Sequence, residues 1–256
     1  MTWPRIIVIA SQKGGVAKTT TCLSLGASLA EKGRSVLLVD LDPQAHLTLS
    51  LGLDPAELRH TIKDAMLAHA SLVSVTRETR VPLLDLAPAN RGLSTLDRLL
   101  YGRPNYECFL RDRLMAMNDQ YYDWIIIDSP PSLGTLILNA LTAAELLIIP
   151  TQCEYFASRS LRDVLQLVQL VRQKTNPTLA YRVLITMFDR RNKISHLVRN
   201  ELERSLSNAL LETVIEIDTK LRESPVFGQP VTLYAPHTRG AMQYRALAQE
   251  LMNHAR

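Results

Sequence analysis

Short apolar runs alternate with amphipathic stretches along most of the chain. The runs contain few polar interruptions, which is typical of strands buried on both faces of a parallel sheet. The amphipathic stretches predict covering helices, and residues 19–32 form one such helix, which Gly33 ends. The predicted strands lie at residues 5–10, 35–39, 83–87, 124–128, 145–150 and 182–188, with a weaker candidate at 214–217. This order predicts an α/β protein with a mainly parallel sheet and helices on both faces, built as one domain over residues 1–256.

A further helix is indicated after the fifth strand, because apolar residues recur there at helical spacing. The apolar stripe, which we expect in the core, consists of Leu161, Val164, Leu165, Val168 and Val171. The polar positions expected to face outward are Arg162, Gln166, Gln169 and Arg172.

A glycine-containing loop, residues 11–20 with the sequence SQKGGVAKTT, lies between the first predicted strand and the first predicted helix. Glycine lets such a loop wrap so that its N–H groups point at phosphate oxygens, and the helix N-terminus adds partial positive charge. Lys18 can reach the outer phosphates, and the Thr19 hydroxyl can ligate Mg²⁺. This order of strand, loop, Lys-Thr and helix is typical of P-loop NTPases. The predicted nucleotide-binding residues are Lys13, Gly14, Gly15, Val16, Ala17, Lys18, Thr19 and Thr20.

Residue 17 departs from the usual P-loop pattern, which has glycine immediately before the lysine. If the loop needs a positive φ at this position, Ala17 costs roughly 1 kcal/mol of backbone strain. We expect the loop to tolerate this cost.

Acidic residues end two of the predicted strands. Asp40 and Asp42 end the second strand, where alternation of side chains would point both to the same side, and Asp128 ends the fourth. The carboxyl edge of a parallel sheet faces the ligand crevice, and hydrolysis of a nucleotide needs carboxylates near Mg²⁺. We therefore expect Thr19, Asp40 and Asp128 at the metal, with Asp40 supporting either Mg²⁺ or the loop.

The composition restricts the class of protein. Hydrophobic residues make up 46% and charged residues 21%, which is the balance of a globular rather than a disordered chain. No apolar run is long enough to span a bilayer, and we expect a cytoplasmic protein. Cys22, Cys108 and Cys153 lack metal-binding spacing and are expected to be reduced thiols.

Positive charge is concentrated in one region. Residues 155–199 carry nine Lys or Arg and two acids, a net charge of +7 in a chain whose total is +4, so the remainder sums to −3. A basic region on a neutral body indicates a polyanion as a partner. A solvated basic helix without a partner would give the same count.

A lysine at the start of the loop distinguishes this chain from ordinary P-loop proteins. With Lys13 and Lys18 in the pattern KGGxxKT, it resembles the deviant Walker-A ATPases: ParA partition proteins, MinD, the nitrogenase iron protein and the arsenite-pump ATPase. The resemblance narrows to ParA proteins of the short chromosomal type and covers nearly the whole chain. The supporting stretches are DLDPQ at 40–44, IDSPPSLG at 127–134, NAL at 139–141, QCEYFA at 152–157, TMFD at 186–189 and SPVFGQP at 224–230. The chain departs from the family at Ala45-His46, which replace Gly-Asn, and at 216–218, where EID replaces Pro-Arg-Asn near the adenine.

The resemblance implies an ATPase that uses ATP and Mg²⁺, with Lys13, Lys18 and Asp42 as catalytic residues. It implies that Lys13 crosses a homodimer interface to the other protomer's phosphates and that Asp42 positions the attacking water. It also implies non-specific binding to double-stranded DNA, a ParB-like centromere-binding partner that stimulates hydrolysis, a nucleoid-associated location, and a chromosome, plasmid or other assembly as cargo. The expected DNA contacts are Arg190, Arg191, Lys193, Arg199, Lys220 and Arg222, with Arg159, Arg162 and Arg172 as further candidates.

Other functions stay open. A MinD-like membrane ATPase would end in a basic amphipathic helix, and the tail at 246–254 carries little basic charge, so we expect no membrane partner. A nucleotide-gated DNA-binding protein without hydrolysis would result if Ala17 disables the loop, which a turnover assay with and without DNA would reveal. An iron–sulfur reductase component needs two cysteines at its dimer axis, a pattern that Cys108 and Cys153 do not match.

Overall fold

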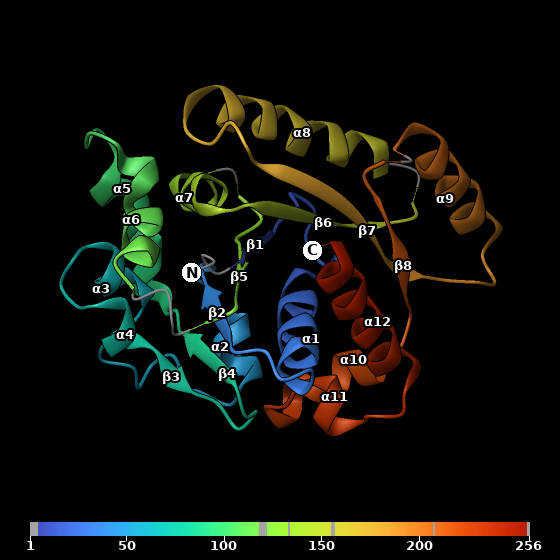
Figure 1. Ribbon diagram of the computed structural model, residues 1–256, viewed down its shortest axis with the longest axis horizontal. Helices are drawn as coiled ribbons and strands as arrows, with labels where there is room; N and C mark the ends of the chain where they lie inside the picture. The colour runs from blue at the N-terminus through green and yellow to red at the C-terminus, as the bar shows by residue number, and fades with distance from the viewer. Residues whose placement is uncertain (1–4, 118–121, 133, 155–156, 207, 255–256) are drawn as a thin grey trace.

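The strands of the described residues form one sheet in the order β3-β4-β2-β5-β1-β6-β7-β8 (Figure 1). The computed structural model describes residues 5–117, 122–132, 134–154, 157–206 and 208–254, with the backbone alone at residues 97, 157–160 and 254. All neighbouring strands run parallel except β3, which is antiparallel to β4. The strands are β1 (Arg5–Ile9), β2 (Val36–Asp40), β3 (Arg77–Glu78), β4 (Leu84–Ala87), β5 (Trp124–Asp128), β6 (Leu146–Gln152), β7 (Ala180–Phe188) and β8 (Leu210–Glu216).

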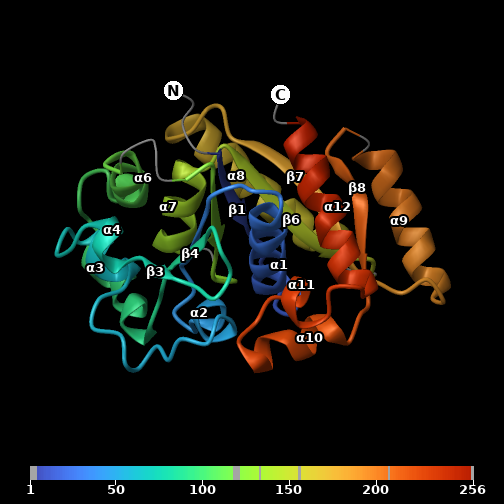
Figure 2. The same ribbon diagram turned by 60° about the horizontal axis from the view of Figure 1, so that its bottom comes forward.

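Helices cover both faces of the sheet, which confirms the predicted fold class (Figures 1 and 2). Ile7 and Ile9 point to the face covered by α1, α2, α11 and α12. Ile6 and Val8 point to the opposite face, where α3 to α9 pack. Successive residues of a strand face opposite sides of the sheet, and helices cover both sides. Each strand therefore needs apolar residues at nearly every position. The α-helices are α1 (Lys18–Glu31), α2 (His46–Ser50), α3 (Ile62–Met66), α4 (Leu72–Val75), α5 (Leu96–Leu100), α6 (Phe109–Met115), α7 (Thr135–Ala143), α8 (Ala157–Lys174), α9 (Lys193–Ser205), α10 (Lys220–Glu223), α11 (Val231–Tyr234) and α12 (Arg239–His254). The 3₁₀ helices are η1 (Arg91–Thr95), η2 (Tyr106–Cys108) and η3 (Ser224–Phe227).

Helix α1 lies close against the sheet because a glycine faces it. A Cβ on Gly26 would lie 2.8 Å from Cδ2 of Leu38 on β2, a contact that would force the helix or the leucine to move. The helix ends at Glu31, one residue before the predicted end, and Gly33 follows with a φ of 76°. Its first turn contains no acidic residue, so the partial positive charge of its N-terminus is available to a ligand.

The predicted boundaries were least accurate toward the β8 edge of the sheet. β8 begins at Leu210 rather than at residue 214 and ends before Ile217, because polar residues interrupt its apolar pattern. An edge strand needs only partial burial, and the β7–β8 ladder contains register shifts. The two-residue β3 at the other edge was not predicted, since it is too short to carry a periodic signal.

Helix α8 confirms the predicted stripe. Leu161, Val164, Val168 and Val171 are buried and Leu165 is half-buried, while the four polar residues predicted to face outward are exposed. Across the part of the chain that the structure describes, no helix combines the length and apolarity needed to cross a bilayer.

Candidate active site

The register of three central strands gathers the predicted site at one edge of the sheet. Asp128, the last residue of β5, pairs with Ile9 at the end of β1 and with Asp40 at the end of β2. The chain beyond each strand is tied to its neighbours: the Leu41 amide donates to the Asp128 carbonyl at 2.9 Å, and Ser129 Oγ donates to the Ile9 carbonyl at 2.9 Å. The phosphate loop and the acids therefore meet at this edge although they are distant in sequence.

A cavity of about 590 Å³ opens at this edge. The phosphate loop, the loop after β2 and the loop after β5 surround one end of it, and the ends of β7 and β8 with helix α10 surround the other. The lining residues are Gly14, Gly15, Ala17, Lys18, Thr19, Thr20, Asp42, Gln44, His46, Pro131, Met187, Ile215, Glu216, Ile217, Asp218, Leu221 and Arg222. One end of the cavity is thus polar and lined by the phosphate loop, and the other end contains several apolar side chains.

The phosphate loop is held in shape by backbone angles and by contacts from distant strands. Gly15 has a φ of 73° and Ala17 a φ of 67°, so both adopt the left-handed conformation. The condition for backbone strain at Ala17 is therefore met. Gln152 Nε2 at the end of β6 donates to the Gly15 carbonyl at 3.1 Å, and Thr186 Oγ1 on β7 donates to the Val16 carbonyl at 3.1 Å.

Lys18 begins α1 and is almost fully buried in the wall of the cavity. Its Nζ donates to the Lys13 carbonyl at 3.3 Å. Burial lowers the pKa of Lys18, although attraction to Asp128 and to Asp42 opposes this effect. An ammonium group that is poorly solvated and close to a helix N-terminus is well placed to bind an anion such as phosphate.

Thr19 and Asp128 fit a magnesium ion. Thr19 Oγ1 donates to Asp128 Oδ2 at 2.7 Å, which joins a hydroxyl and a carboxylate of the kind that bind Mg²⁺. Among the described residues, Oδ1 of the fully buried Asp128 has no nitrogen or oxygen donor, and the buried Cys22 thiol is a weak neighbouring donor. Burial, followed by repulsion from Asp40, raises the pKa of Asp128. A divalent cation would offset both the burial of the Asp128 charge and its repulsion from Asp40. Mg²⁺ commonly uses only one or two carboxylates together with phosphate oxygens.

Asp40 and Asp42 play different structural roles. β2 ends at Asp40, so the strand alternation that we used to place both acids on one side does not extend to Asp42 and was the wrong argument. Asp40 Oδ1 accepts from the Asp42 amide at 3.0 Å, and its Oδ2 accepts from the Thr48 amide at 2.9 Å and from Thr48 Oγ1 at 2.7 Å. These contacts favour the loop-supporting alternative for Asp40. Asp42 lines the cavity, with Oδ1 fixed by the Gln44 amide at 2.9 Å.

Lys13 lies outside the cavity that contains Lys18. Its Nζ donates to Gln152 Oε1 at 3.0 Å and forms an ion pair with Glu154 just beyond β6. The Lys13 side chain is 36% exposed and that of Glu154 is 59% exposed, so the pair is accessible to solvent. The two loop lysines therefore face different environments, one buried beside the acids and one at the surface.

The predicted DNA-contacting residues occupy neighbouring exposed segments, but most of their positive charges are already paired with acidic side chains. Arg190 and Arg191 follow β7, Lys193 and Arg199 lie on α9, and Lys220 and Arg222 lie on α10, with Arg222 lining the cavity. Four of the six form ion pairs: Arg190 with Glu216, Arg191 with Asp189, Arg199 with Glu203 and Lys220 with Glu223. The additional candidates Arg162 and Arg172 lie on α8, at the opposite side of the molecule from α10 (Figure 1). The side chain of Arg159 is outside the described residues.

Several cavity and loop contacts were not predicted from the sequence. Gln152 and Thr186 support the phosphate loop, a role that neither residue's sequence context indicates. His46 and Gln44 line the cavity beside Asp42. A lining position after a strand carries no local signal, because it depends on which strands become neighbours.

Comparison with known proteins agrees with this site. A family model described as an AAA domain matches residues 4–181. The sporulation initiation inhibitor protein Soj of Bacillus subtilis is 41% identical over 248 residues, which cover 96% of this chain and 98% of Soj. The chromosome partitioning protein ParA of Myxococcus xanthus is 41% identical over 249 residues, which cover 97% of this chain and 88% of that protein.

Solved structures share the fold and are described with nucleotide bound. Cobyrinic acid a,c-diamide synthase from Mycobacterium smegmatis with bound ADP and magnesium is 37% identical, with a TM-score of 0.86 over 98% of this chain and 95% of that one. The septum site-determining protein MinD from Pyrococcus horikoshii, complexed with Mg-ADP, is 26% identical, with a TM-score of 0.78 over 97% and 96% of the two chains. A further structure of the M. smegmatis protein, 37% identical with a TM-score of 0.86 over 98% of this chain and 95% of that one, contains an ATP analogue and magnesium.

The left-handed conformation of Ala17 generates a prediction about stability. Ala17→Gly removes strain of about 1–2 kcal/mol and gives back part of it through greater freedom of the unfolded chain, so we expect a net gain of roughly 0.5–1 kcal/mol. Urea unfolding of the nucleotide-free protein measures this. The control is Ala246→Gly at an exposed position inside α12, which should destabilise by about 1 kcal/mol. A loss of stability in Ala17→Gly would show that the methyl group makes compensating contacts.

Proposed function

Since this chain belongs to the ParA family of P-loop ATPases, we propose that it is a positioning ATPase that dimerises on ATP and binds DNA without sequence preference. In this proposal a ParB-like partner stimulates hydrolysis and releases the protein from DNA, so that a cargo follows the bound ATPase along the nucleoid. The observation that carries the proposal is the separation of the two loop lysines, with Lys18 in the cavity wall and Lys13 at the surface. The name of the M. smegmatis relative denotes a biosynthetic reaction, so the fold alone does not select partition.

Hydrolysis is assigned to residues around the polar end of the cavity. Lys18 neutralises charge on the outer phosphates, and Asp42 accepts a hydrogen bond from water and orients it for in-line attack. Asp42 lines the cavity and its Oδ1 accepts from the Gln44 amide, which holds the carboxylate in place for this role. Thr19 and Asp128 would hold Mg²⁺, which when bound neutralises charge on the phosphate oxygens.

The dimer proposal requires Lys13 to change partner. Within one protomer its ammonium group contacts Gln152 and Glu154, so it must leave Glu154 before it can reach the nucleotide of a second protomer. An exposed ion pair of this kind is worth about 0.2–1 kcal/mol, which a new contact with phosphate would outweigh. Glu154 therefore acts as a weak competitor for Lys13 before dimerisation.

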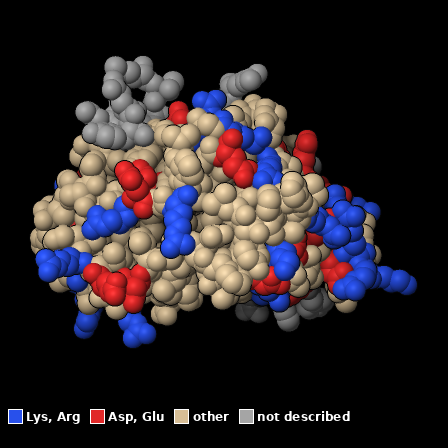
Figure 3. All heavy atoms as spheres, turned by 90° about the horizontal axis from the view of Figure 1, so that it is seen from below, with Lys and Arg blue, Asp and Glu red and all other residues tan. Residues whose placement is uncertain are grey.

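DNA binding is assigned to the surface formed by α9, α10 and the loop after β7. Figure 3 shows Lys and Arg gathered at the right-hand edge of the face it presents, on the side that carries α9 in Figure 2. Phosphate contact is the simpler mode of binding, because a non-specific complex needs charge rather than base contacts. A protomer offers few free cations, so a two-fold dimer that doubles the contacts should bind far more tightly than a monomer.

A membrane-bound positioning ATPase is the competing function. It would require binding to lipid, and pelleting with liposomes that contain anionic lipid tests it directly. Strong ATP-dependent pelleting, together with absent DNA binding, would favour the membrane function over partition.

Lys18 and Asp42 should separate binding from turnover. Lys18→Ala should weaken ATP affinity at least tenfold, about 1.4 kcal/mol, because it removes the charge that faces the outer phosphates. Asp42→Ala should keep ATP affinity but lower turnover by roughly two orders of magnitude. Calorimetry and phosphate release measure the two effects. Unchanged ATP affinity in Lys18→Ala would overturn the assignment of the cavity, and normal turnover in Asp42→Ala would assign the water to another acid.

Glu154 should restrain dimerisation. Glu154→Gln removes the ion pair with Lys13, and we expect the ATP-dependent dimer to form at a roughly two- to thirtyfold lower protein concentration, because each of the two such pairs in a dimer is worth about 0.2–1 kcal/mol. Light scattering at several protein concentrations measures this. The matched control is Glu31→Gln, which breaks the half-buried pair with Arg245 away from the loop and should cause no shift. Lys13→Gln should abolish dimerisation with or without Glu154→Gln. A weaker dimer in Glu154→Gln alone would mean that Glu154 itself contributes to the interface.

The DNA surface should behave electrostatically. In the Asp42→Ala background with ATP, Arg191→Glu or Lys220→Glu should weaken binding to any DNA sequence. The slope of log affinity against log salt should flatten by about 2, because a dimer loses two phosphate contacts. The control is Arg111→Glu on α6, on the far side of the molecule in Figure 1, which should leave the slope unchanged. Salt-independent binding, or equal binding by monomer and dimer, contradicts the proposed surface.

A further inference from the structure

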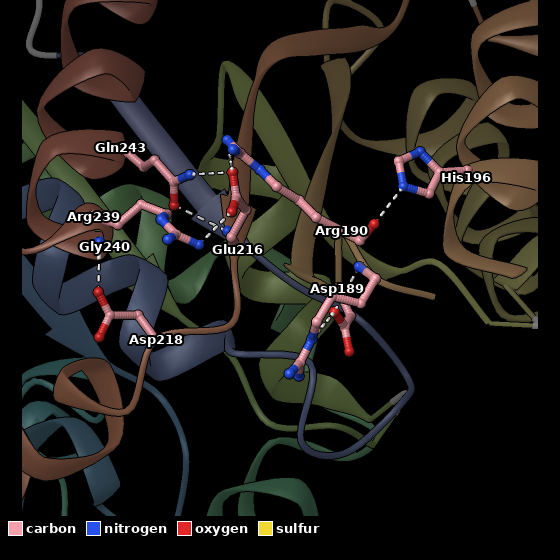
Figure 4. Close-up of polar contacts among 9 residues, drawn as sticks. Asp189, Arg190, His196, Glu216, Asp218, Arg239, Gly240 and Gln243 are labelled. Atoms are coloured by element: carbon pink, nitrogen blue, oxygen red, sulfur yellow. Dashed lines mark hydrogen bonds and ion pairs between the residues drawn. The ribbon is translucent and has the colours of Figure 1, made fainter. Parts of the chain in front are cut away.

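Three chain segments meet around one carboxylate at the far end of the cavity (Figure 4). Glu216 is the last residue of β8, Arg190 lies in the loop after β7, and Arg239 and Gln243 lie on α12. Glu216 Oε1 forms an ion pair with Arg190 Nη2 at 2.5 Å and accepts from Gln243 Nε2 at 3.0 Å, and Oε2 accepts from Arg239 Nη1 at 2.7 Å. The Glu216 amide also donates to Gln243 Oε1 at 3.0 Å. We call these four residues the Glu216 clamp.

The Glu216 clamp differs from the other ion pairs of the basic surface in its burial. The Glu216 side chain is only 5% exposed, whereas those of Arg190 and Arg239 are 68% and 55% exposed. The acids that pair with Arg191, Arg199 and Lys220 are all much more accessible to water. A buried carboxylate is costly unless charged donors satisfy it, so Arg190 is held more firmly than its neighbours. Exposed pairs, in contrast, exchange partners at little cost.

The position of Glu216 relates the clamp to nucleotide binding. Glu216 and its neighbours Ile215, Ile217 and Asp218 line the end of the cavity remote from Lys18. A second tie fixes the same segment, because Asp218 Oδ2 accepts from the Gly240 amide at 2.8 Å. The segment is therefore attached at two points to the start of α12 (Figure 4).

Arg190 is anchored through its backbone as well as its side chain. Its carbonyl accepts a hydrogen bond from His196 Nε2 on α9 at 2.8 Å. Arg190 also follows β7, whose residue Met187 lines the same end of the cavity. The clamp thus joins the ends of β7 and β8, the two strands that bound this part of the cavity.

We propose that Glu216 is a positioning residue that fixes the base end of the nucleotide cleft, and that Arg190 serves this clamp and does not contact DNA. The inference rests on the proposed binding of triphosphate at Lys18, since the base then reaches the opposite end of the same cavity. The clamp acts on the base and not on the phosphates, because Glu216, the clamp residue that lines the cavity, lies at the end remote from the phosphate loop. It also changes the expectation for Arg190, whose exposed position had placed it among the DNA contacts.

The test compares a ligand that has a base with one that lacks it. Calorimetry with Mg²⁺ measures the affinities of ATP and of inorganic tripolyphosphate for wild type and for Glu216→Gln. We expect ATP affinity to fall at least fivefold while tripolyphosphate affinity is unchanged. A parallel loss for both ligands, or no loss for either, overturns the positioning role. Lys18→Ala should weaken both ligands, so a failure of the proposed phosphate site appears separately as unchanged affinities in that variant.

A milder variant covers the case in which Glu216→Gln does not fold. Arg190→Met keeps the aliphatic stem of the side chain and removes one of the two arginine charges that pair with the carboxylate. It should also weaken ATP relative to tripolyphosphate, and equal effects on the two ligands would overturn the proposal.

The second half of the proposal is tested on DNA at saturating ATP in the Asp42→Ala background. Arg190→Met should leave the salt slope of DNA binding unchanged. Its neighbour Arg191→Met, which loses the same charge, should flatten the slope by about 2 per dimer. A flattening of equal size in Arg190→Met would return Arg190 to the DNA surface.

Discussion

The parallel register of β1, β2 and β5 is the constraint on which the site depends. With Ile9, Asp128 and Asp40 side by side, the phosphate loop and the loops after β2 and β5 all emerge at one edge. A slip of one residue would turn each side chain to the opposite face and remove Asp128 from Thr19. The register is strongly specified because these strands are buried on both faces, so a slip would also expose or misplace two sets of apolar side chains. The fold therefore fixes the distances needed for chemistry through core packing, not through the site residues.

The sequence was sufficient for those parts of the molecule whose signals are local. Continuous apolar runs predicted the central strands, and the glycines, Lys18 and Thr19 predicted the phosphate loop, because each feature needs only neighbouring residues. The role of Asp42 could not be placed by alternation, since its position depends on a turn beyond β2. The contacts of Lys13 with Gln152 and Glu154 join parts of the chain 139 and 141 residues apart. No periodic pattern in the sequence predicts a contact between residues so far apart.

The surface charge also depends on contacts between residues that are distant in sequence. The basic region at 155–199 was counted as if its cations were free, but Glu203 and Glu216, which lie outside that window, pair with Arg199 and Arg190. The available positive charge is smaller than the count implies, and its distribution depends on which acids are buried. An accessible acid leaves its cation able to exchange for a phosphate, whereas a buried acid keeps it.

The left-handed alanines bear on how such loops are recognised in sequences. Ala17 precedes the loop lysine with a φ of 67°, and Ala45 is the N-cap of α2 with a φ of 54°, each at a position where glycine is usual in this family. Both alanines adopt the left-handed conformation that glycine reaches without strain. A text pattern that insists on glycine before the lysine would discard this chain, although its loop has the required shape. A definition based on backbone dihedral angles would retain this chain. It would also retain other chains in which a residue other than glycine adopts the left-handed conformation at a small cost in strain.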